Sequence, residues 1–321
     1  MNTEVNYLGL KLKNPIIVGS SSLTNSVEKN IEICKAGAGA IVLKSIFEEQ
    51  ILINTSKIQD ANINDYPEAH DYLASVNKDR EIDNYINLIS ETKKNVDIPV
   101  IASVNCKNTG EWVSLVKEIE NAGADAIEIN ISLLPVNFEN TSSINEEKYI
   151  EILKNVRANT KLPIALKMSK YAAGLANLVQ KISYTGYVDA FVLFNKYYSP
   201  DIDINNLRIT QANISSRIDS ENPLRWLAIF TAEIENTQFG ASPNVRSYQD
   251  IIKQILAGAT AVQAVSLFYE QGIEIIPQLL KQLENWMTEK GFNSIDDFRG
   301  KMNYKNAEHA IAYKRTQFMS Y

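Results

Sequence analysis

The stretch AGADAIEIN, residues Ala122–Asn130, decides the fold of this chain because the same junction occurs three times along it. The other copies are AGAGAIVLK at Ala36–Lys44 and AGATAVQAV at Ala257–Val265. In each copy a glycine ends an amphipathic helical pattern, and one or two residues lead directly into a short apolar run. Repeated junctions of this kind indicate alternating strands and helices, and therefore a parallel sheet with helices outside it.

Strand-like and helix-like patterns alternate along the whole chain. The apolar runs lie at Asn14–Gly19, Ala40–Ser45, Pro99–Val104, Ala126–Ile131, Pro163–Met168, Ala190–Asn195, Gln238–Ser242 and Ala261–Ser266. The helical patterns lie at Ser26–Ala36, Ile82–Asn95, Glu111–Ala122, Glu146–Asn155, Ala172–Tyr184, Leu224–Glu235, Tyr248–Ala257 and Ile273–Lys290. Eight strands close a parallel barrel, so we expect an α/β fold of the (β/α)8 TIM barrel class.

A single barrel is the domain organisation that we expect. Residues 1–300 form the barrel with a short N-terminal hairpin around Tyr7–Lys13, and residues 301–321 form a C-terminal extension packed on the barrel or on a partner subunit. The competing architecture is a doubly wound open sheet, which needs a G-x-G-x-x-G turn after its first strand to bind a dinucleotide. No such turn follows the first apolar run, so the barrel is favoured.

Composition and charge narrow the functional classes. The 321 residues carry a formal net charge of -6, with no basic stripe with interleaved aromatics, so nucleic acid is not an expected partner. No apolar run reaches the length of a membrane span, and the N-terminus lacks the layout of a signal peptide. The two cysteines, Cys34 and Cys106, argue against a disulfide framework. We expect a soluble cytoplasmic protein that does not bind membranes.

Polar residues end several of the apolar runs, where barrel enzymes keep their chemistry. These residues are Lys44, Asn105, Asn130 with Ser132, Lys167 and Asn195. Two buried ammonium groups require an anionic or electron-rich ligand to compensate them. Asparagines offer a donor and an acceptor together, which suits the imide edge of a heterocycle such as a flavin or a pyrimidine. Three connections are long: Phe47–Glu81, Leu133–Glu146 and Lys196–Pro223. Each begins at the carboxyl end of an expected strand, where these polar residues also lie.

Glu128 is expected to have a structural role inside the barrel. It lies two residues before Asn130, so the two side chains share a face of the fourth strand. A carboxylate in that position would pair with a lysine, because a lone charge in the barrel interior is costly.

The order of motifs is similar to that of the dihydroorotate dehydrogenase family, the FMN-dependent barrel enzymes of pyrimidine synthesis. The resemblance runs from Tyr7 to Met302 and rests on NP…VGSSS, AGAGAIVLKS, EINIS, IALKM, LFN and QILAGATAVQ. The closing stretch EKGFNSIDDFRGKM resembles the end of the soluble class 1 enzymes. The resemblance implies hydride transfer between a small heterocyclic substrate and FMN, and a homodimer.

Roles can be carried over where this sequence matches the family's motifs. Lys44 is similar to a lysine that contacts flavin and substrate, and Lys167 to one near the N1/C2 edge of the flavin. Asn130 is similar to an asparagine that binds flavin and substrate, and Asn195 to one that binds substrate. Ser20 falls where a turn borders the flavin.

The position of the catalytic base departs from the family. Its cysteine or serine stands three residues after the asparagine matched by Asn130, and Leu133 occupies that place. Leucine cannot accept a proton, so the catalytic residue is left unassigned. Ser132 is a weak candidate, because on an extended chain it turns to the other face. Cys106 matches no family role and is expected to be an ordinary thiol.

The ligand-binding loops depart as well. The family's asparagine-rich substrate loop reads Tyr72–Lys78 here, without glycine or proline, and the glycine-rich phosphate loops read Gly240–Val245 and Ala264–Leu267. Ser242, Asn244, Arg246 and Ser266 could replace the lost backbone donors with side-chain donors, so FMN is still expected. The family's glycine-rich turn before the seventh helix is also absent, and a segment that contains Arg217 stands in its place. Arg225 follows this segment. The two arginines are either solvated surface charges or ligands of an anion.

Two functions from different classes remain open. The first is a dihydroorotate dehydrogenase-like flavoprotein oxidoreductase. The second is a non-catalytic barrel that binds a ligand or a protein partner, which the altered phosphate loops and the aromatic tail from Lys301 to Tyr321 favour. Bound flavin discriminates between them.

Overall fold

A computed structural model describes residues 1–47, 67–106, 112–131, 133–134, 136–196, 200–211 and 223–315. Within these ranges only the backbone is described at 47, 67–79, 106, 112–114, 200 and 211. No helix among the described residues is both long enough and apolar enough to span a bilayer.

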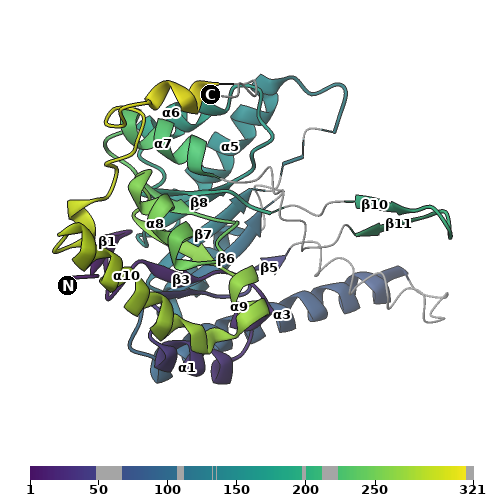
Figure 1. Ribbon diagram of the computed structural model, residues 1–321. Coiled ribbons are helices and arrows are strands. Elements are labelled where there is room, and N and C mark those ends of the chain that lie inside the picture. The colour runs from purple at the N-terminus through teal and green to yellow at the C-terminus, as the bar shows by residue number, and fades with distance from the viewer. Residues whose placement is uncertain are drawn as a thin grey trace.

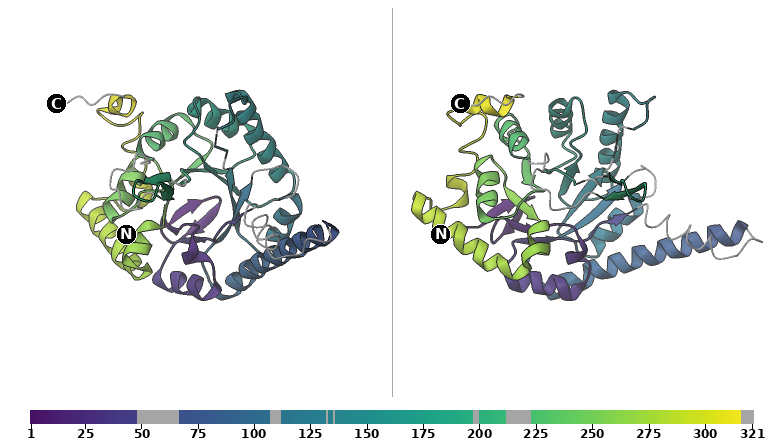
Figure 2. Two further views of the ribbon diagram at one scale, coloured as in Figure 1. Left: turned by 90° about the vertical axis from the view of Figure 1, so that its right-hand side faces the viewer. Right: turned by 45° about the vertical axis from the view of Figure 1, so that its right-hand side comes forward.

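The parallel strands form a closed ring, which confirms the (β/α)8 barrel (Figure 2). Its strands are β3 (Ile16–Val18), β4 (Ala40–Val42), β6 (Val100–Cys106), β7 (Ala126–Ile131), β8 (Ile164–Met168), β9 (Ala190–Leu193), β12 (Gln238–Ala241) and β13 (Ala261–Ala264). Each strand pairs with its neighbours in chain order, and the β13–β3 pair closes the ring. All carboxyl ends of the strands therefore lie at one end of the barrel, here called the mouth.

Helices surround this ring as the amphipathic patterns predicted. They are α1 (Val27–Ala36), α3 (Pro67–Asn95), α4 (Trp112–Asn121), α5 (Ser142–Arg157), α6 (Leu175–Thr185), α7 (Leu224–Glu233), α8 (Tyr248–Leu256) and α10 (Ile276–Lys290). The glycines of the three repeated junctions, Gly37, Gly123 and Gly258, have φ values of 95°, 90° and 113°. Only a residue without Cβ adopts this conformation readily, so each glycine ends its helix and directs the chain into the next strand.

Two helical segments differ from the predicted pattern. Helix α3 begins at Pro67, well before the expected start at Ile82, and includes the stretch Tyr72–Lys78 that we expected in a substrate loop. That stretch has neither glycine nor proline, so no residue in it interrupts the helix. Helix α9 (Ser266–Gln271) follows β13 directly, and the 3-10 turn η2 (Ile273–Ile275) then leads into α10.

Hairpins extend the barrel at both of its ends. The predicted N-terminal hairpin is confirmed as β1 (Val5–Tyr7) and β2 (Leu10–Leu12), and the side chain of Gln238, the first residue of β12, bonds its backbone at Asn6 and Leu8. A second hairpin, β10 (Pro200–Asp203) and β11 (Arg208–Gln211), lies in the long connection after β9 and projects beyond the mouth (Figure 1).

The residues that follow the barrel run back along its outer helices. The backbone N–H of Met302 donates to Leu256, and that of Tyr304 donates to Ala228. The 3-10 turn η4 (Ala310–Lys314) then lies beside α7, where Arg225 donates to the carbonyl of Arg315.

Candidate active site at the barrel mouth

The second barrel strand is interrupted at the mouth. Strand β4 ends at Val42, and pairing with β6 resumes only in the short strand β5 (Ile46–Phe47). Leu43 still donates its N–H to Ile101, but Lys44 and Ser45 leave the ladder, and the N–H of Ser45 donates to Ser20 Oγ at 2.9 Å. The break therefore frees Lys44 and Ser45 from strand pairing at the end of the barrel where a ligand would bind.

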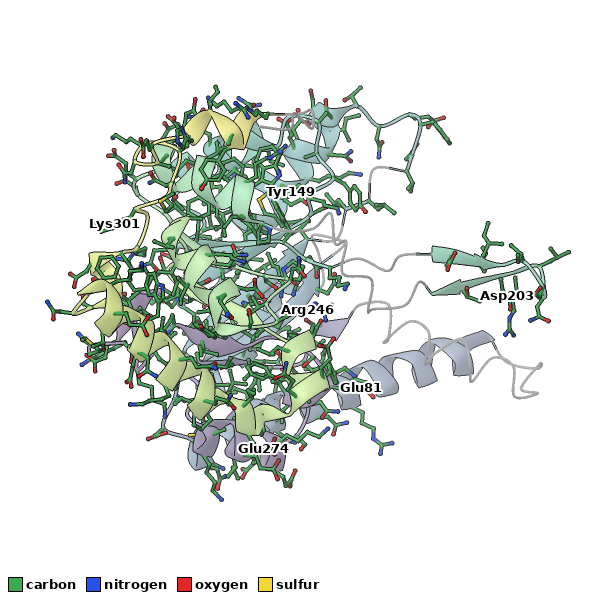
Figure 3. All side chains as sticks on the ribbon, in the orientation of Figure 1. Glu81, Tyr149, Asp203, Arg246, Glu274 and Lys301 are labelled. Carbon is green, nitrogen blue, oxygen red and sulfur yellow. The ribbon has the colours of Figure 1, made fainter. Side chains whose placement is uncertain are left out.

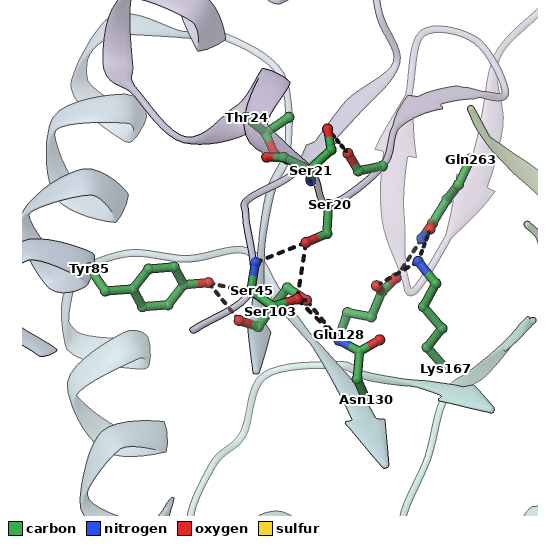
Figure 4. Close-up of polar contacts among 11 residues, drawn as sticks. Ser20, Ser21, Thr24, Ser45, Tyr85, Ser103, Glu128, Asn130, Lys167 and Gln263 are labelled. Atoms are coloured by element: carbon green, nitrogen blue, oxygen red, sulfur yellow. Dashed lines mark hydrogen bonds and ion pairs between the residues drawn. The ribbon is translucent and has the colours of Figure 1, made fainter. Parts of the chain in front are cut away.

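A network of small polar side chains joins the ends of four successive strands (Figure 4). Ser20 Oγ lies 3.0 Å from Ser45 Oγ, which lies 2.7 Å from Ser103 Oγ. Asn130 Nδ2 donates to Ser103 Oγ at 2.9 Å and to Ser45 Oγ at 3.4 Å. In the described part of the chain the hydrogen bonds of the Asn130 side chain are made by its Nδ2 atom, which leaves the amide oxygen to accept a hydrogen bond from a ligand.

Below this network lies a buried ion pair, which confirms the pairing expected for Glu128. Lys167 Nζ lies 3.3 Å from Glu128 Oε1 and donates to Gln263 Oε1 at 2.9 Å, and Gln263 Nε2 donates to the other carboxylate oxygen of Glu128. All three residues are buried. The carboxylate compensates the ammonium charge, and since an ammonium group has three protons, one remains for a ligand.

Strand register brings the predicted residues Asn130 and Lys167 together with Asn105. Asn105 pairs with Asn130, and Asn130 pairs with Lys167, so the three side chains lie on the same face of adjacent strands. The Oδ1 atom of Asn105 is buried and has no hydrogen-bond partner among the residues that the structure describes. A buried acceptor without a partner is costly, and the N–H of a heterocyclic ligand would satisfy it.

Lys44 and Asn195, also predicted to bind ligands, are half-buried and follow β4 and β9, which lie on opposite sides of the ring. Lys44 lies in the break of the second strand, where no side-chain partner for its ammonium group is found among the described residues. The backbone N–H of Asn195 donates to Met168 at 2.8 Å, which holds the segment after β9 against the end of β8. A cation and a buried acceptor that have no partner in the described part of the chain fit an electron-rich heterocycle with both N–H and C=O groups, as the isoalloxazine ring of FMN has.

The residues predicted for the phosphate lie after the seventh and eighth barrel strands, where barrels commonly bind phosphate. Ser242 is buried and follows β12, Asn244 adopts the left-handed conformation with φ of 73°, and Ser266 begins α9. Arg246 Nη1 forms a short ion pair with Glu270. This pair connects the loop after β12 to helix α9, so a phosphate bound there would share Arg246 with a carboxylate of the protein.

Leu133 occupies the place of the family's base and offers no proton acceptor there. It is half-buried and packs against the hydrophobic core. The other candidates named from the sequence, Ser132 and Arg217, lie outside the described residues, as does the side chain of Cys106.

Four residues of the site were missed by sequence reasoning: Ser45, Tyr85, Ser103 and Gln263. Ser45, Ser103 and Gln263 are polar residues within or just after apolar runs, and that interruption was an available signal. Tyr85 lies on α3, and nothing in the sequence distinguishes it from other helical tyrosines. Its hydroxyl accepts from the N–H of Ser103 at 2.6 Å and donates to the C=O of Ser103 at 3.0 Å.

Comparison with known proteins adds independent information to this geometry. Residues 2–287 match the family described as dihydroorotate dehydrogenase. The catalytic subunit of dihydroorotate dehydrogenase B (NAD(+)) from Thermoplasma volcanium is 26% identical, over 91% of this chain and 95% of the relative. That of Caldicellulosiruptor saccharolyticus is 25% identical, over 94% of this chain and 100% of the relative. The dihydroorotate dehydrogenase (fumarate) of Lachancea kluyveri is 24% identical, over 93% of this chain and 98% of the relative.

Proposed function

Because this chain belongs to the dihydroorotate dehydrogenase family, we propose that it is an FMN-dependent oxidoreductase that transfers hydride between a small heterocyclic substrate and FMN. The observation that carries the proposal is the row of Asn105, Asn130 and Lys167 beside Lys44, whose ammonium group has no side-chain partner within the described ranges. We place the enzyme in the cytoplasm, because its two cysteines suit a reducing compartment.

The chain's own polar groups have separate tasks at the mouth. Bound FMN supplies the hydride-accepting N5 atom. Lys167 would offer its remaining proton to the N1/C2 edge of the flavin and would stabilise negative charge there. The amide oxygens of Asn105 and Asn130 accept hydrogen bonds from ligand N–H groups. Lys44 and Asn195 would bind the substrate.

The phosphate is held by side chains in this proposal, in place of the glycine-rich loops of the family. Ser242, Asn244 and Ser266 supply neutral donors, and Arg246 supplies a charge that the phosphate shares with Glu270. Backbone donors are rigid, whereas these side chains must be ordered on binding. We therefore expect weaker FMN binding than a glycine-rich nest provides.

Leu133 restricts the substrate. Dihydroorotate loses a proton from C5 as hydride leaves the ring, and the residue matched to the family's base cannot accept that proton. The proposal therefore assigns to this chain a heterocycle whose proton exchanges with water or with a loop residue.

The visible spectrum of the purified protein tests the proposal. We expect the absorption bands of oxidised flavin, or their appearance with a red shift when FMN is added to the apoprotein. Lys44→Ala should weaken FMN binding by about 10- to 150-fold, since the loss of one charge-assisted contact weakens binding by about 1.5–3 kcal/mol. Lys117→Ala, which removes an exposed lysine of α4, is the matched control. A colourless protein that takes up no FMN would instead support the non-catalytic barrel.

We also propose that the chain forms a homodimer through the β10–β11 hairpin. Ile202 pairs with Ile209, so both lie on one face of the hairpin, and Ile204 and Leu207 follow in its turn; these four residues are between 68% and 86% exposed. The opposite face carries the pairs Asp201–Thr210 and Asp203–Arg208. A two-stranded hairpin is marginally stable alone, and Figure 3 shows this one, with Asp203, standing clear of the barrel. A two-fold axis would pack two such uncharged aliphatic faces together.

Light scattering after size-exclusion chromatography tests this dimer. Ile202→Lys combined with Ile209→Lys should halve the molar mass, because like charges would face each other across the axis. The control, Asp201→Lys with Thr210→Lys, places the same charges on the opposite face and should leave the mass unchanged. A monomeric wild-type protein, or equal masses in both variants, rejects the hairpin as the interface.

A further inference from the structure

We infer that Tyr85 is a positioning residue that holds open the break in the second barrel strand and thereby fixes Lys44 and Ser45 at the mouth. The inference rests on the proposed function for the identity of the ligand, but the break itself is a property of the apoprotein. Nothing in the family resemblance or in the predicted site pointed to this residue.

The register shows which bonds the break removes from the barrel. Ile41 N donates to Pro99, and Leu43 N donates to Ile101 at 2.9 Å. A continuous parallel ladder would next join the N–H of Ser103 to the second strand and its C=O to the N–H of Ser45. Ser45 instead donates to Ser20 Oγ, which leaves both backbone groups of Ser103 without a strand partner.

The hydroxyl of Tyr85 satisfies both of these groups. A phenol is a donor and an acceptor at one atom, so a single side chain replaces two bonds of the ladder. Tyr85 is buried, and burial raises its pKa above the usual value, so the hydroxyl keeps the proton that it donates. Removing this hydroxyl leaves the backbone of Ser103 either unpaired or free to pair with Leu43–Ser45.

Helix α3 presents Tyr85 at a defined place through contacts that do not involve the mouth. Asn30 Nδ2, on α1, donates to Thr92 Oγ1 at 3.0 Å, and Lys93 Nζ lies 2.7 Å from Asp125 Oδ2. The helix therefore stays in place when the hydroxyl is removed. The consequence of Tyr85→Phe is confined to the break, where Ser45 belongs to the network with Ser20, Ser103 and Asn130.

Lys44 connects the open break in the second strand to ligand binding. It stands between Leu43, which bonds to β6, and Ser45, which bonds to the serine network. Its own N–H donates to the carbonyl of Thr24 at 3.2 Å, and the anchor on its other side, the bond from Ser45 to Ser20, forms only while the break is open. If the break closed or loosened, the ammonium group would leave the position from which it meets the ligand.

A double-mutant cycle tests the inference with FMN as the probe. The apoprotein and its variants Tyr85→Phe, Lys44→Ala and the combined variant are titrated with FMN. We expect Tyr85→Phe to weaken FMN binding by about tenfold. The combined variant should bind FMN with an affinity within about twofold of that of Lys44→Ala. Fully additive losses would show that Tyr85 does not act through Lys44 and would overturn the inference.

Amide hydrogen exchange of the apoprotein separates this test from the proposed function. Peptides that cover Leu43–Phe47 should change their exchange by about tenfold or more in Tyr85→Phe, slower if the strand closes on β6 and faster if the segment loosens. Tyr184→Phe, which removes the hydroxyl of an exposed tyrosine of α6, is the control and should leave these peptides and FMN affinity unchanged. Unchanged exchange in Tyr85→Phe rejects the inference even if FMN binds, and a changed rate supports it even if FMN does not bind.

Discussion

Lys167→Met is expected to lower the free energy of unfolding of the apoprotein by about 3–5 kcal/mol, because it leaves a buried carboxylate without its counter-ion. Glu128 is 1% exposed, and its remaining partner, Gln263, is neutral. Methionine retains most of the volume of the lysine stem, so the loss of stability reflects the unpaired carboxylate and not a cavity. Urea denaturation of the two proteins, with equal slopes, measures the difference.

The double variant Glu128→Gln with Lys167→Met is the control for this prediction. It removes both charges and leaves Gln263 to pair with another amide, so most of the lost stability should return. If the double variant is as unstable as Lys167→Met, the loss arises from packing and the ion pair has little effect. The double variant should still bind FMN more weakly than the wild type, because the donor assigned to the N1/C2 edge is absent.

Leu133→Cys is expected to accelerate the reduction of bound FMN by dihydroorotate by about 10²–10⁴-fold, the usual contribution of a positioned general base. The thiolate would stand at the position of the family's base, three residues after Asn130, and could accept the C5 proton. Loss of the flavin absorbance in anaerobic stopped-flow mixing measures the rate.

Leu133→Ala is the matched control, because it opens the same space without adding a base. Affinity for dihydroorotate is measured separately in both variants, so that a binding defect is not mistaken for a missing base. Equal rates at saturating dihydroorotate in the cysteine and alanine variants would contradict the assignment of residue 133 as the base position.

The barrel and the positions of most site residues could be predicted from the sequence, because both depend on local patterns. Glycines with positive φ mark the helix ends at all three repeated junctions, and strand β7 has the predicted bounds Ala126–Ile131. Polar residues at the ends of apolar runs were identified as mouth residues for the same reason. The early start of α3 at Pro67 was missed because a family loop was expected where the residues themselves form a helix.

The sequence by itself determined an alternating fold, a polar mouth, a carboxylate inside the barrel and the absence of a base at Leu133. Only the tertiary structure decided that the lysine paired with Glu128 is Lys167 and that Gln263 hydrogen-bonds to both. It also decided that the hydroxyl of Tyr85 makes the two backbone hydrogen bonds that the interrupted second strand does not make. Such contacts join residues far apart in the chain, up to 135 positions between Glu128 and Gln263. Periodicity indicates which face of an element a side chain occupies, whereas its partner depends on ring closure and strand register, which no local stretch encodes.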